Sequence, residues 1–247
     1  MIGLSILLMI LVGFYVNLNI NHLTTRYLRD ISFTLENENL VILGSNGAGK
    51  TTLAQAIVHL LENESVTIED KRVSDLCAKE RARYLNFVPS KLEIFDEYID
   101  VHEFLELSLL NGTPYEEIEN VLRRLEIDHL KNKSCSAISS GESQLVLCAS
   151  ALLHNATLTL FDEPTANLDS DKKIKIFELL KNDDRFKIVI THDLNLAFKL
   201  GFRVIFLEHG SIIYDGRCEH FFEEENLNRL FGHSIRRVED FFMVNYQ

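Results

Sequence analysis

The sequence predicts an α/β fold with a mainly parallel sheet, an N-terminal antiparallel β subdomain and an inserted helical subdomain. Three observations lead to this prediction. Short apolar runs separated by segments of helical length follow one another from residue 40 onward. Two earlier segments alternate apolar and polar residues, which is the period of a half-buried strand. Between residues 91 and 133 the pattern is helical, and strand signals resume afterwards.

The first strands are expected near the N-terminus. Residues 16–21 (VNLNIN) and 31–35 (ISFTL) alternate in polarity, and residues 36–39 (ENEN) read as the turn after the second strand. Residues 40–43 (LVIL) are continuously apolar, as expected of a strand that is buried on both faces of a parallel sheet. A glycine-rich loop and a helical pattern through Leu60 follow.

The segment from residue 91 to residue 133 is expected to hold amphipathic helices on either side of a break at residues 111–114 (NGTP). Their apolar faces consist of Val101, Phe104, Leu105 and Leu109, and of Ile118, Val121, Leu122 and Leu125. Because strand signals resume later, we interpret this segment as a helical insertion and not as a separate domain.

Three further short strands are expected at residues 158–161, 188–190 and 204–207. We therefore predict one domain over residues 1–247. In it, residues 1–90 and 143–247 form the α/β core with the β subdomain, and residues 91–142 form the helical subdomain.

The length and charge of the chain limit its function. Its 247 residues suffice for the core of one large domain or of a domain with an inserted subdomain. The 25 basic and 37 acidic residues give a net charge of −12. This charge argues against a nucleic-acid partner, because binding phosphates over a broad surface needs clustered cations. It does not exclude nucleotide binding, for which backbone N–H groups and one or two lysines suffice.

The four cysteines are scattered, without a CxxC pair or the spacing of a zinc site. They are Cys77, Cys135, Cys148 and Cys218. We interpret them as small buried hydrophobic residues of a protein in a reducing cytosol.

The N-terminal segment is unusual in composition, because residues 2–16 (IGLSILLMILVGFYV) carry no charge. This run is shorter than the roughly 17–25 apolar residues of a membrane span. It also lacks the basic start and small-residue cleavage site of a signal peptide. We favour a structural role or a translation start at Met9. Contact with a membrane surface or a partner, and a true anchor, are the alternatives.

A phosphate-binding loop lies between the strand at residues 40–43 and the helix after it. Its residues match the GxxxxGK[ST] pattern and are Gly44, Ser45, Asn46, Gly47, Ala48, Gly49, Lys50 and Thr51. The glycines let successive backbone N–H groups and the helix N-terminus point at a phosphate. Lys50 supplies a charge for the β- and γ-phosphates, and Thr51 supplies a hydroxyl for Mg²⁺. The core is therefore predicted to be that of a P-loop NTPase.

Two adjacent carboxylates, Asp162 and Glu163, follow the strand at residues 158–161. Successive side chains along a strand point in opposite directions, so the two carboxylates can do different jobs. We expect Asp162 to hold hydrated Mg²⁺ and Glu163 to polarise the water that attacks the γ-phosphate.

A helix running through Leu153 is expected to start at residues 139–142 (SSGE). Ser139 and Glu142 have the spacing of a capping box, which is a purely structural explanation. The same features, a hydroxyl, backbone N–H groups and a positive helix end, also suit an anion. Since the phosphate-binding loop already serves one side of a nucleotide, a second anion site is useful if it comes from another subunit.

These motifs resemble those of the ATP-binding subunit of ATP-binding cassette (ABC) transporters, over residues 17–216. Residues 44–52 resemble the Walker A motif, residues 139–142 the signature, residues 158–163 Walker B and residues 166–169 the D-loop. His192 matches the switch histidine that contacts the γ-phosphate. The resemblance implies Glu163 and His192 as catalytic residues. It adds to the nucleotide contacts Thr52, Ser139, Gly141, Glu142 and Asp169.

The resemblance also implies how such a chain works. In the family, two subunits enclose two ATP molecules between Walker A of one and the signature of the other. We therefore expect ATP and Mg²⁺ as cofactors, and a second ATPase subunit and transmembrane permease subunits as partners. A peripheral position at the cytoplasmic face of the membrane follows from these partners.

Three positions depart from the family pattern. Ser90 stands where the family has the glutamine that reaches Mg²⁺ and the attacking water, so this shorter side chain needs a bridging water. Ser140 replaces the first signature glycine, and its side chain crowds the facing nucleotide. The aromatic residue that stacks on adenine is not obvious, with His22 nearest the expected place and Tyr27 later in the chain. These departures imply a slow or asymmetric ATPase.

The predicted function is the energising subunit of a membrane transporter. The helical insertion, the short C-terminus and residues 230–238 resemble the group that imports iron-siderophore, haem or cobalamin complexes. One alternative is a soluble ABC-type ATPase of DNA repair or the ribosome, although the long coiled coil or second cassette of those classes is not seen in this sequence. Another alternative is a nucleotide-dependent regulator with low turnover.

Overall fold

The computed structural model describes residues 15–92, 98–110 and 112–245. The uncharged N-terminal run, apart from Tyr15 and Val16, lies outside these residues, so its proposed roles stay predictions. Within the described residues, no helix is both long and apolar enough to cross a membrane.

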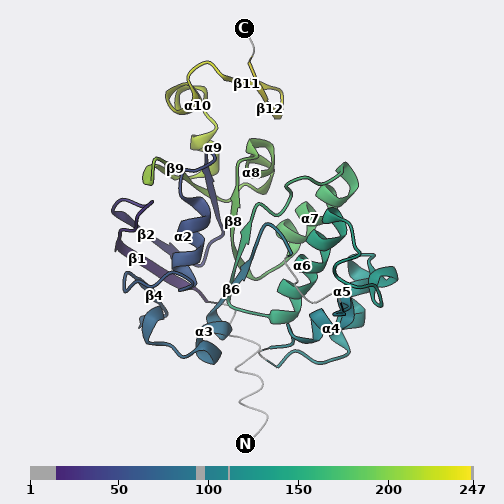
Figure 1. Cartoon of the computed structure of the whole chain (residues 1–247). Helices are drawn as coiled ribbons and strands as arrows, with labels where there is room; N and C mark the ends of the chain where they lie inside the picture. The colour runs from purple at the N-terminus through teal and green to yellow at the C-terminus, as the bar shows by residue number, and fades with distance from the viewer. Residues whose placement is uncertain (1–14, 93–97, 111, 246–247) are drawn as a thin grey trace, which may run out of the picture.

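A six-stranded sheet forms the centre of the molecule, in the order β10-β9-β3-β8-β7-β6 (Figure 1). Only β10 at one edge is antiparallel to its neighbour. The strands are β3 (Leu40–Gly44), β6 (Leu85–Val88), β7 (Leu158–Asp162), β8 (Phe186–Thr191), β9 (Arg203–Glu208) and β10 (Ser211–Gly216). The predicted mainly parallel sheet is confirmed.

Strand β3 is buried along its whole length, as its continuous apolar run predicts. Alternate side chains enter two separate cores. Leu40 and Ile42 belong to the core on one face of the sheet, and Val41 and Leu43 to the core on the other face. The central sheet is therefore covered on both sides.

The antiparallel sheet and helix α2 cover one face. The sheet has the order β2-β1-β4-β5, with β1 (Asn17–Leu23), β2 (Ile31–Glu36), β4 (Val66–Ile68) and β5 (Lys71–Arg72). Helix α2 (Lys50–Ile57) ends three residues before the predicted Leu60, because Val58 and His59 leave the helical conformation and His59 has a φ of 59°. The short segments η1 (Val73–Asp75) and α3 (Ala78–Tyr84) lead from β5 to β6.

Helices cover the opposite face. They include α4 (Val101–Glu106), α5 (Glu117–Arg124), the turn η2 (Asp128–Leu130), α6 (Ser140–His154), α7 (Ser170–Asn182) and α8 (Leu194–Leu200). Helices α4 and α5 both pack on α6. The predicted apolar faces are correct, since six of the eight residues are buried and Phe104 and Leu109 pack against the same core. The exact division into subdomains stays a prediction.

The chain ends in a small appendage that we did not predict. It consists of α9 (Cys218–Phe221), α10 (Glu224–Phe231) and a hairpin of β11 (Ile235–Val238) and β12 (Phe241–Val244). Figure 1 shows it at the top of the molecule, beyond α8. The prediction of four buried cysteines is wrong for Cys77, which is exposed just before α3, and correct for the other three.

Candidate functional site

Four of the predicted site residues lie at one edge of the central sheet. Lys50 follows β3, Asp162 ends β7 with Glu163 after it, and His192 follows β8. These three strands are adjacent and parallel, so their carboxyl ends lie at the same edge. Ligands of open α/β sheets bind at this kind of edge.

The phosphate-binding loop has the backbone shape that its glycines predict. A Cβ atom on Gly44 would lie 2.3 Å from the carbonyl oxygen of Leu207, so no other residue fits there. Gly49 has a φ of 101° and precedes the first residue of α2. Ser45, Asn46 and Gly47 at the tip are exposed. The backbone N–H groups at the start of α2 are thus available to an anion.

The side chain of Lys50 is hydrogen-bonded to the backbone of this loop. Its Nζ donates hydrogen bonds to the carbonyl oxygens of Gly44, at 2.7 Å, and Ser45, at 3.0 Å. Burial lowers the pKa of Lys50, and the nearby carboxylates of Glu163 and Asp162 oppose that shift. The Lys50 ammonium is therefore already positioned at the loop in the chain without nucleotide.

Asp162 is buried, and only one of its two carboxylate oxygens is hydrogen-bonded. Its Oδ2 accepts a hydrogen bond of 2.8 Å from the Thr51 hydroxyl, while its Oδ1 has no hydrogen-bond partner among the residues that the structure describes. Burial raises the pKa of Asp162, as does the charge of Glu163, while the bond from Thr51 and the charge of Lys50 lower it. An unpaired buried oxygen beside a hydroxyl suits a hard cation such as Mg²⁺, which prefers oxygen ligands. These two residues fit the predicted metal site.

Glu163 turns away from Asp162 and contacts His192. The residue has a left-handed φ of 49°, and its backbone N–H donates to Ile190 at 2.8 Å. Its Oε1 lies 2.8 Å from Nδ1 of His192, and its Oε2 accepts a longer bond of 3.4 Å from the Thr191 hydroxyl. Backbone strain of this kind is common at active sites. The side chain of His192 is 58% exposed, so its ring is open to a ligand.

The signature segment is folded as a helix start. Ser139 caps α6: its hydroxyl accepts from the Glu142 N–H at 3.3 Å, and its own N–H donates to the Glu142 carboxylate at 2.8 Å. Ser140 is exposed in the first turn. The predicted capping box is confirmed, and the positive helix end faces outward.

Gly141 of α6 and Asp169, the N-cap of α7, both lie against Lys172 of α7. A Cβ atom on Gly141 would lie 2.7 Å from Cδ of Lys172, so the absence of a side chain lets α7 pack closely. Asp169 caps α7 and also pairs with the ammonium of Lys172. Lys172 therefore joins the D-loop to the signature segment.

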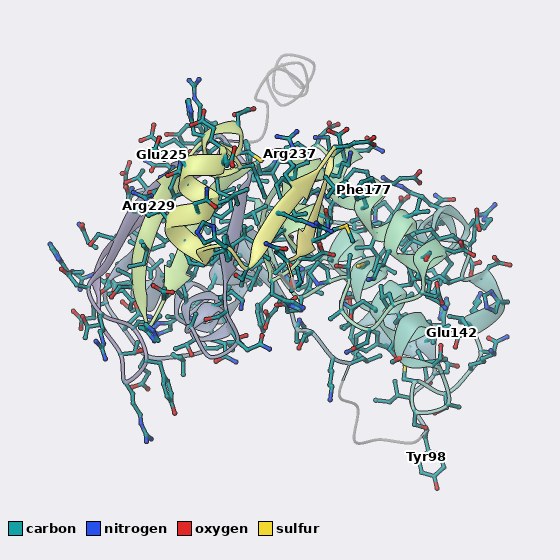
Figure 2. The ribbon with its side chains drawn as sticks, turned by 90° about the horizontal axis from the view of Figure 1, so that it is seen from above. Tyr98, Glu142, Phe177, Glu225, Arg229 and Arg237 are labelled. Atoms are coloured by element: carbon teal, nitrogen blue, oxygen red, sulfur yellow. The ribbon has the colours of Figure 1, made fainter. Side chains whose placement is uncertain are left out.

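The structure does not bring the signature to the phosphate-binding loop of the same chain. Residues of α2 belong to the core on one face of the central sheet, and residues of α6 to the core on the other face. Figure 1 shows the two helices on opposite sides of β8, and Figure 2 shows Glu142 within the helical lobe. The predicted site residues thus form two groups.

Three further positions singled out in the sequence are Ser90, Tyr27 and His22. Ser90 is exposed two residues after β6, at the same sheet edge, and has no hydrogen-bond partner within residues 15–92, 98–110 and 112–245. The carbonyl oxygen of Tyr27 lies 3.3 Å from the place of a Cβ on Gly49, and its ring is exposed. His22 instead pairs with Asp30 at 2.6 Å. Tyr27 therefore lies beside the loop through its backbone.

Sequence reasoning missed the role of Thr191. Its hydroxyl donates a hydrogen bond to Glu163 and accepts one of 3.0 Å from the backbone N–H of Asp193. A threonine directly before the predicted switch histidine was the available signal.

Comparisons with known proteins agree with this geometry. Residues 28–166 match the family described as ABC transporter. The chain is 32% identical to the zinc import ATP-binding protein ZnuC 1 of Aliivibrio fischeri, over 82% of this chain and 77% of that protein. It is 27% identical to the "Probable siderophore transport system ATP-binding protein YusV" of Bacillus subtilis, over 82% and 79% of the two chains. A solved dimeric ATP-binding cassette in a post-hydrolysis state, bound to ADP and Pi, shares 26% identity and a TM-score of 0.70, covering 82% of this chain and 98% of that one.

Proposed function

The chain belongs to the ABC transporter family as an ATP-binding ATPase subunit, and from this premise we propose that two copies enclose two ATP molecules and power a membrane importer. The observation that supports this proposal best is the division of the site into two groups. Lys50, Asp162 and Glu163 lie at the sheet edge, and Ser139 lies on the helix that packs on the other face. Neither group alone surrounds a nucleotide.

In the first half-site, this chain holds its own ATP. Lys50 and the N–H groups of the loop bind the phosphates, and Tyr27 offers its exposed ring to adenine. Mg²⁺, when held by Thr51 and Asp162, neutralises charge on the β- and γ-phosphates. Glu163 accepts a proton from the attacking water. His192, bonded to Glu163, presents its ring to the γ-phosphate.

In the second half-site, this chain serves the partner's ATP. The capped start of α6 presents Ser139, Gly141 and Glu142 to the γ-phosphate from the opposite side, and Asp169 borders the same surface. Ser140 places an exposed hydroxymethyl group where the family has glycine, and Ser90 offers only a short hydroxyl toward the metal. We propose that these two serines slow the hydrolysis of ATP.

The cargo is proposed from resemblance and relatives. The relatives named above are a zinc importer subunit and a siderophore transport subunit. We propose import of a metal ion in complexed form, of the iron-siderophore, haem or cobalamin type, through transmembrane permease subunits. The ATPase would then lie at the cytoplasmic face of the membrane. Stimulation of its rate by a co-expressed permease, and not by a ribosome or DNA, separates this function from that of a soluble ABC ATPase.

A low-turnover regulator is the second candidate, and Ser90 and Ser140 are the observations that favour it. A regulator would dimerise on ATP with little hydrolysis in the presence of the permease. A transport subunit would hydrolyse ATP faster once the permease and its cargo are present.

The variant Glu163→Gln tests the catalytic part of the proposal. It removes the proton acceptor and keeps the size of the side chain, so the ATPase rate should fall at least about 100-fold. ATP should still bind, and the trapped dimer should elute ahead of the monomer in size-exclusion chromatography. Glu178→Gln, on the exposed face of α7, is the matched control. Hydrolysis by Glu163→Gln at the parent rate would show that Glu163 is not the base.

A further inference from the structure

The side chain of Lys172, on helix α7, lies against the start of the neighbouring helix α6. The two helices pack side by side (Figure 1). A Cβ atom on Gly141 would lie 2.7 Å from Cδ, 3.1 Å from Cε and 3.2 Å from Nζ of Lys172. Non-bonded carbon atoms prefer a separation of about 3.5–4.0 Å, so the lysine stem occupies the space that a side chain at position 141 would need. Lys172 therefore packs directly on the backbone of the signature segment.

The end of the same side chain is bonded to Asp169 of the D-loop. The Nζ of Lys172 donates to Oδ2 of Asp169 at 2.5 Å, and the backbone N–H of Lys172 donates to Oδ1 at 3.0 Å. The first of these is a charge-assisted hydrogen bond, the stronger kind. Both carboxylate oxygens of Asp169 thus accept a hydrogen bond from Lys172.

The ammonium of Lys172 also lies close to the first turn of α6. Its pKa is raised chiefly by the hydrogen bond to Asp169, and to a smaller extent by the charge of Glu142. Glu142 in turn accepts the backbone N–H of Ser139 at 2.8 Å. One side chain therefore contacts both segments that serve the partner's ATP in the proposed dimer.

We propose that Lys172 is a positioning residue that holds the signature and the D-loop in register for the ATP of the partner chain. The proposal rests on the shared site proposed above, because only in that dimer do both segments face the partner's nucleotide. A shift of α7 along α6 would displace Asp169 relative to Ser139. The packing on Gly141 and the bond to Asp169 both oppose this shift.

The variant Lys172→Met keeps an unbranched stem over Gly141 and removes the ammonium. Its kcat for ATP hydrolysis should fall about tenfold, because a misplacement of about 1 Å can cost up to 100-fold in rate. Its affinity for ADP, measured by calorimetry, should stay within about twofold of the parent, because the chain's own loop at Lys50 binds ADP. Its Tm should change by less than about 2 °C, since an exposed ion pair adds little to stability. A parent-like kcat would overturn the proposal.

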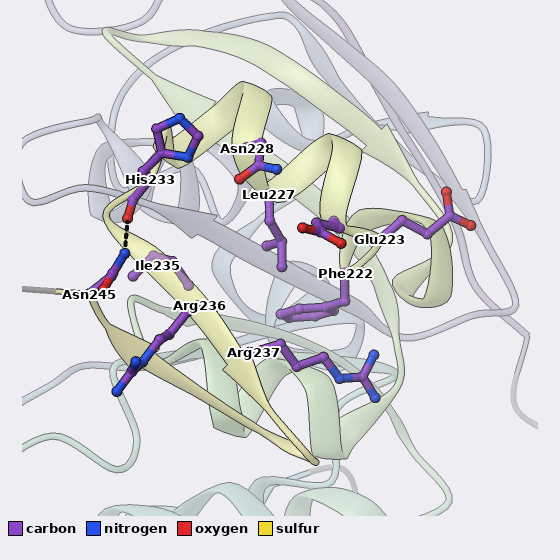
Figure 3. Close-up of a pocket in the computed structure, with 10 residues that line it drawn as sticks. Phe222, Glu223, Leu227, Asn228, His233, Ile235, Arg236, Arg237 and Asn245 are labelled. Carbon is purple, nitrogen blue, oxygen red and sulfur yellow. Dashed lines mark hydrogen bonds between the residues drawn. The ribbon is translucent and has the colours of Figure 1, made fainter. Parts of the chain in front are cut away.

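Three matched variants separate the role of Lys172 from a general effect of charge. Lys172→Arg keeps a positive charge for Asp169 and should retain at least about half of the parent rate. Lys173→Met, next on α7, and Arg236→Met, on strand β11 of the C-terminal appendage (Figure 3), each remove a positive charge from an exposed position. Both should keep the parent rate. Equal losses in Lys172→Met and these two variants, or in Lys172→Arg, would overturn the role.

A double variant tests whether the ammonium acts through Asp169. Asp169→Asn keeps a good helix cap and removes the charge that pairs with Lys172. Lys172→Met should therefore slow Asp169→Asn no further than Asp169→Asn alone is slowed. Two losses that multiply in the double variant would show that Lys172 acts independently of Asp169, which contradicts the proposal.

Mixtures of variants at constant total chain concentration show which ATP Lys172 serves. An equimolar mixture of Lys172→Met and Lys50→Ala should rise to about a quarter of the parent rate, because each mixed dimer has one intact loop that faces an intact signature. A mixture of Lys172→Met and Ser139→Asp should stay below about a tenth, because both changes lie in the same half-site. Recovery with Ser139→Asp in place of Lys50→Ala would show that Lys172 serves its own chain's ATP and would overturn the proposal.

The mixture of Lys50→Ala and Ser139→Asp is the reference for this experiment. If the reference mixture recovers activity and the two mixtures with Lys172→Met do not behave as expected, only the role of Lys172 is wrong. If the reference mixture recovers no activity, the shared site is wrong, and the role of Lys172 falls with it.

Discussion

Asp162 and Glu163 are neighbours in sequence that have opposite environments. Asp162 is 3% exposed, and burial penalises its charge. Glu163 leaves the strand with a left-handed backbone and reaches the exposed ring of His192. The turn after β7 therefore separates the residue suited to a metal from the residue suited to accept a proton.

The raised pKa of Asp162 predicts a stability that depends on pH. An unfolded aspartate titrates near about 3.9. Because the folded carboxyl has a higher pKa, stability falls as pH rises through that pKa. Asp162→Asn removes the buried charge and keeps an oxygen to accept from Thr51. Without nucleotide and Mg²⁺ it should raise Tm at pH 7 by roughly 2–4 °C, the shift that about 1 kcal/mol produces in a domain of this size.

This gain should disappear near pH 3, where the aspartate is protonated in both states. Asp171→Asn, on the exposed face of α7, controls for the loss of one negative charge. A gain that is equal at both pH values, or shared by the control, would contradict the account of Asp162.

At the scale of elements, substitutions of Ser139 can separate two roles of the start of α6, which are capping the helix and contacting a phosphate. Ser139 caps the helix, and we propose that the same end receives the partner's phosphate. Ser139→Ala removes the cap and should cost about 1 kcal/mol of unfolding free energy. Ser139→Asp keeps a good cap but adds a negative charge. It should keep the Tm of the parent and abolish most ATP hydrolysis.

Thermal unfolding and ATPase assays on both variants check this prediction. If Ser139→Asp is as active as the parent, the end of α6 does not face a phosphate. If Ser139→Asp is as unstable as Ser139→Ala, its loss of activity follows from the loss of the helix cap and not from repulsion of a phosphate. Ser136→Asp, three residues before the cap, is the control for the added negative charge, and it should keep the ATPase rate of the parent.

The elements that could be predicted from the sequence are those with a local signal. Strand β3 is buried on both faces and has a continuous apolar run, and α5 has a clear apolar stripe. Strands β4, β5, β11 and β12 are only two to four residues long, and β5, β11 and β12 are mostly exposed, so they lack a period that could be recognised. Their pairing depends on contacts that the sequence order does not contain.

The same limit applies to the site. The loop at Lys50 and the carboxylates at Asp162 and Glu163 follow from short motifs. The position of Tyr27 depends on how the chain between β1 and β2 folds back against Gly49, which spacing along the chain cannot indicate. The bond between Thr191 and Glu163 likewise arises only when β7 and β8 are paired in register.

At the scale of the whole molecule, the central sheet separates the two groups of site residues. The phosphate-binding loop belongs to the face covered by the antiparallel sheet, and the signature to the face covered by helices. A second chain turned head to tail would bring the complementary group to each loop. In this arrangement both copies are required for each ATP.

Mixing two inactive variants tests whether each ATP site is shared by two chains. Lys50→Ala disables the loop and keeps the signature, whereas Ser139→Asp disables the signature and keeps the loop. Each variant alone should show almost no ATPase activity. An equimolar mixture should recover about a quarter of the parent rate, because half of randomly formed dimers are mixed and each has one intact site of two. A mixture as inactive as its components would contradict the shared site.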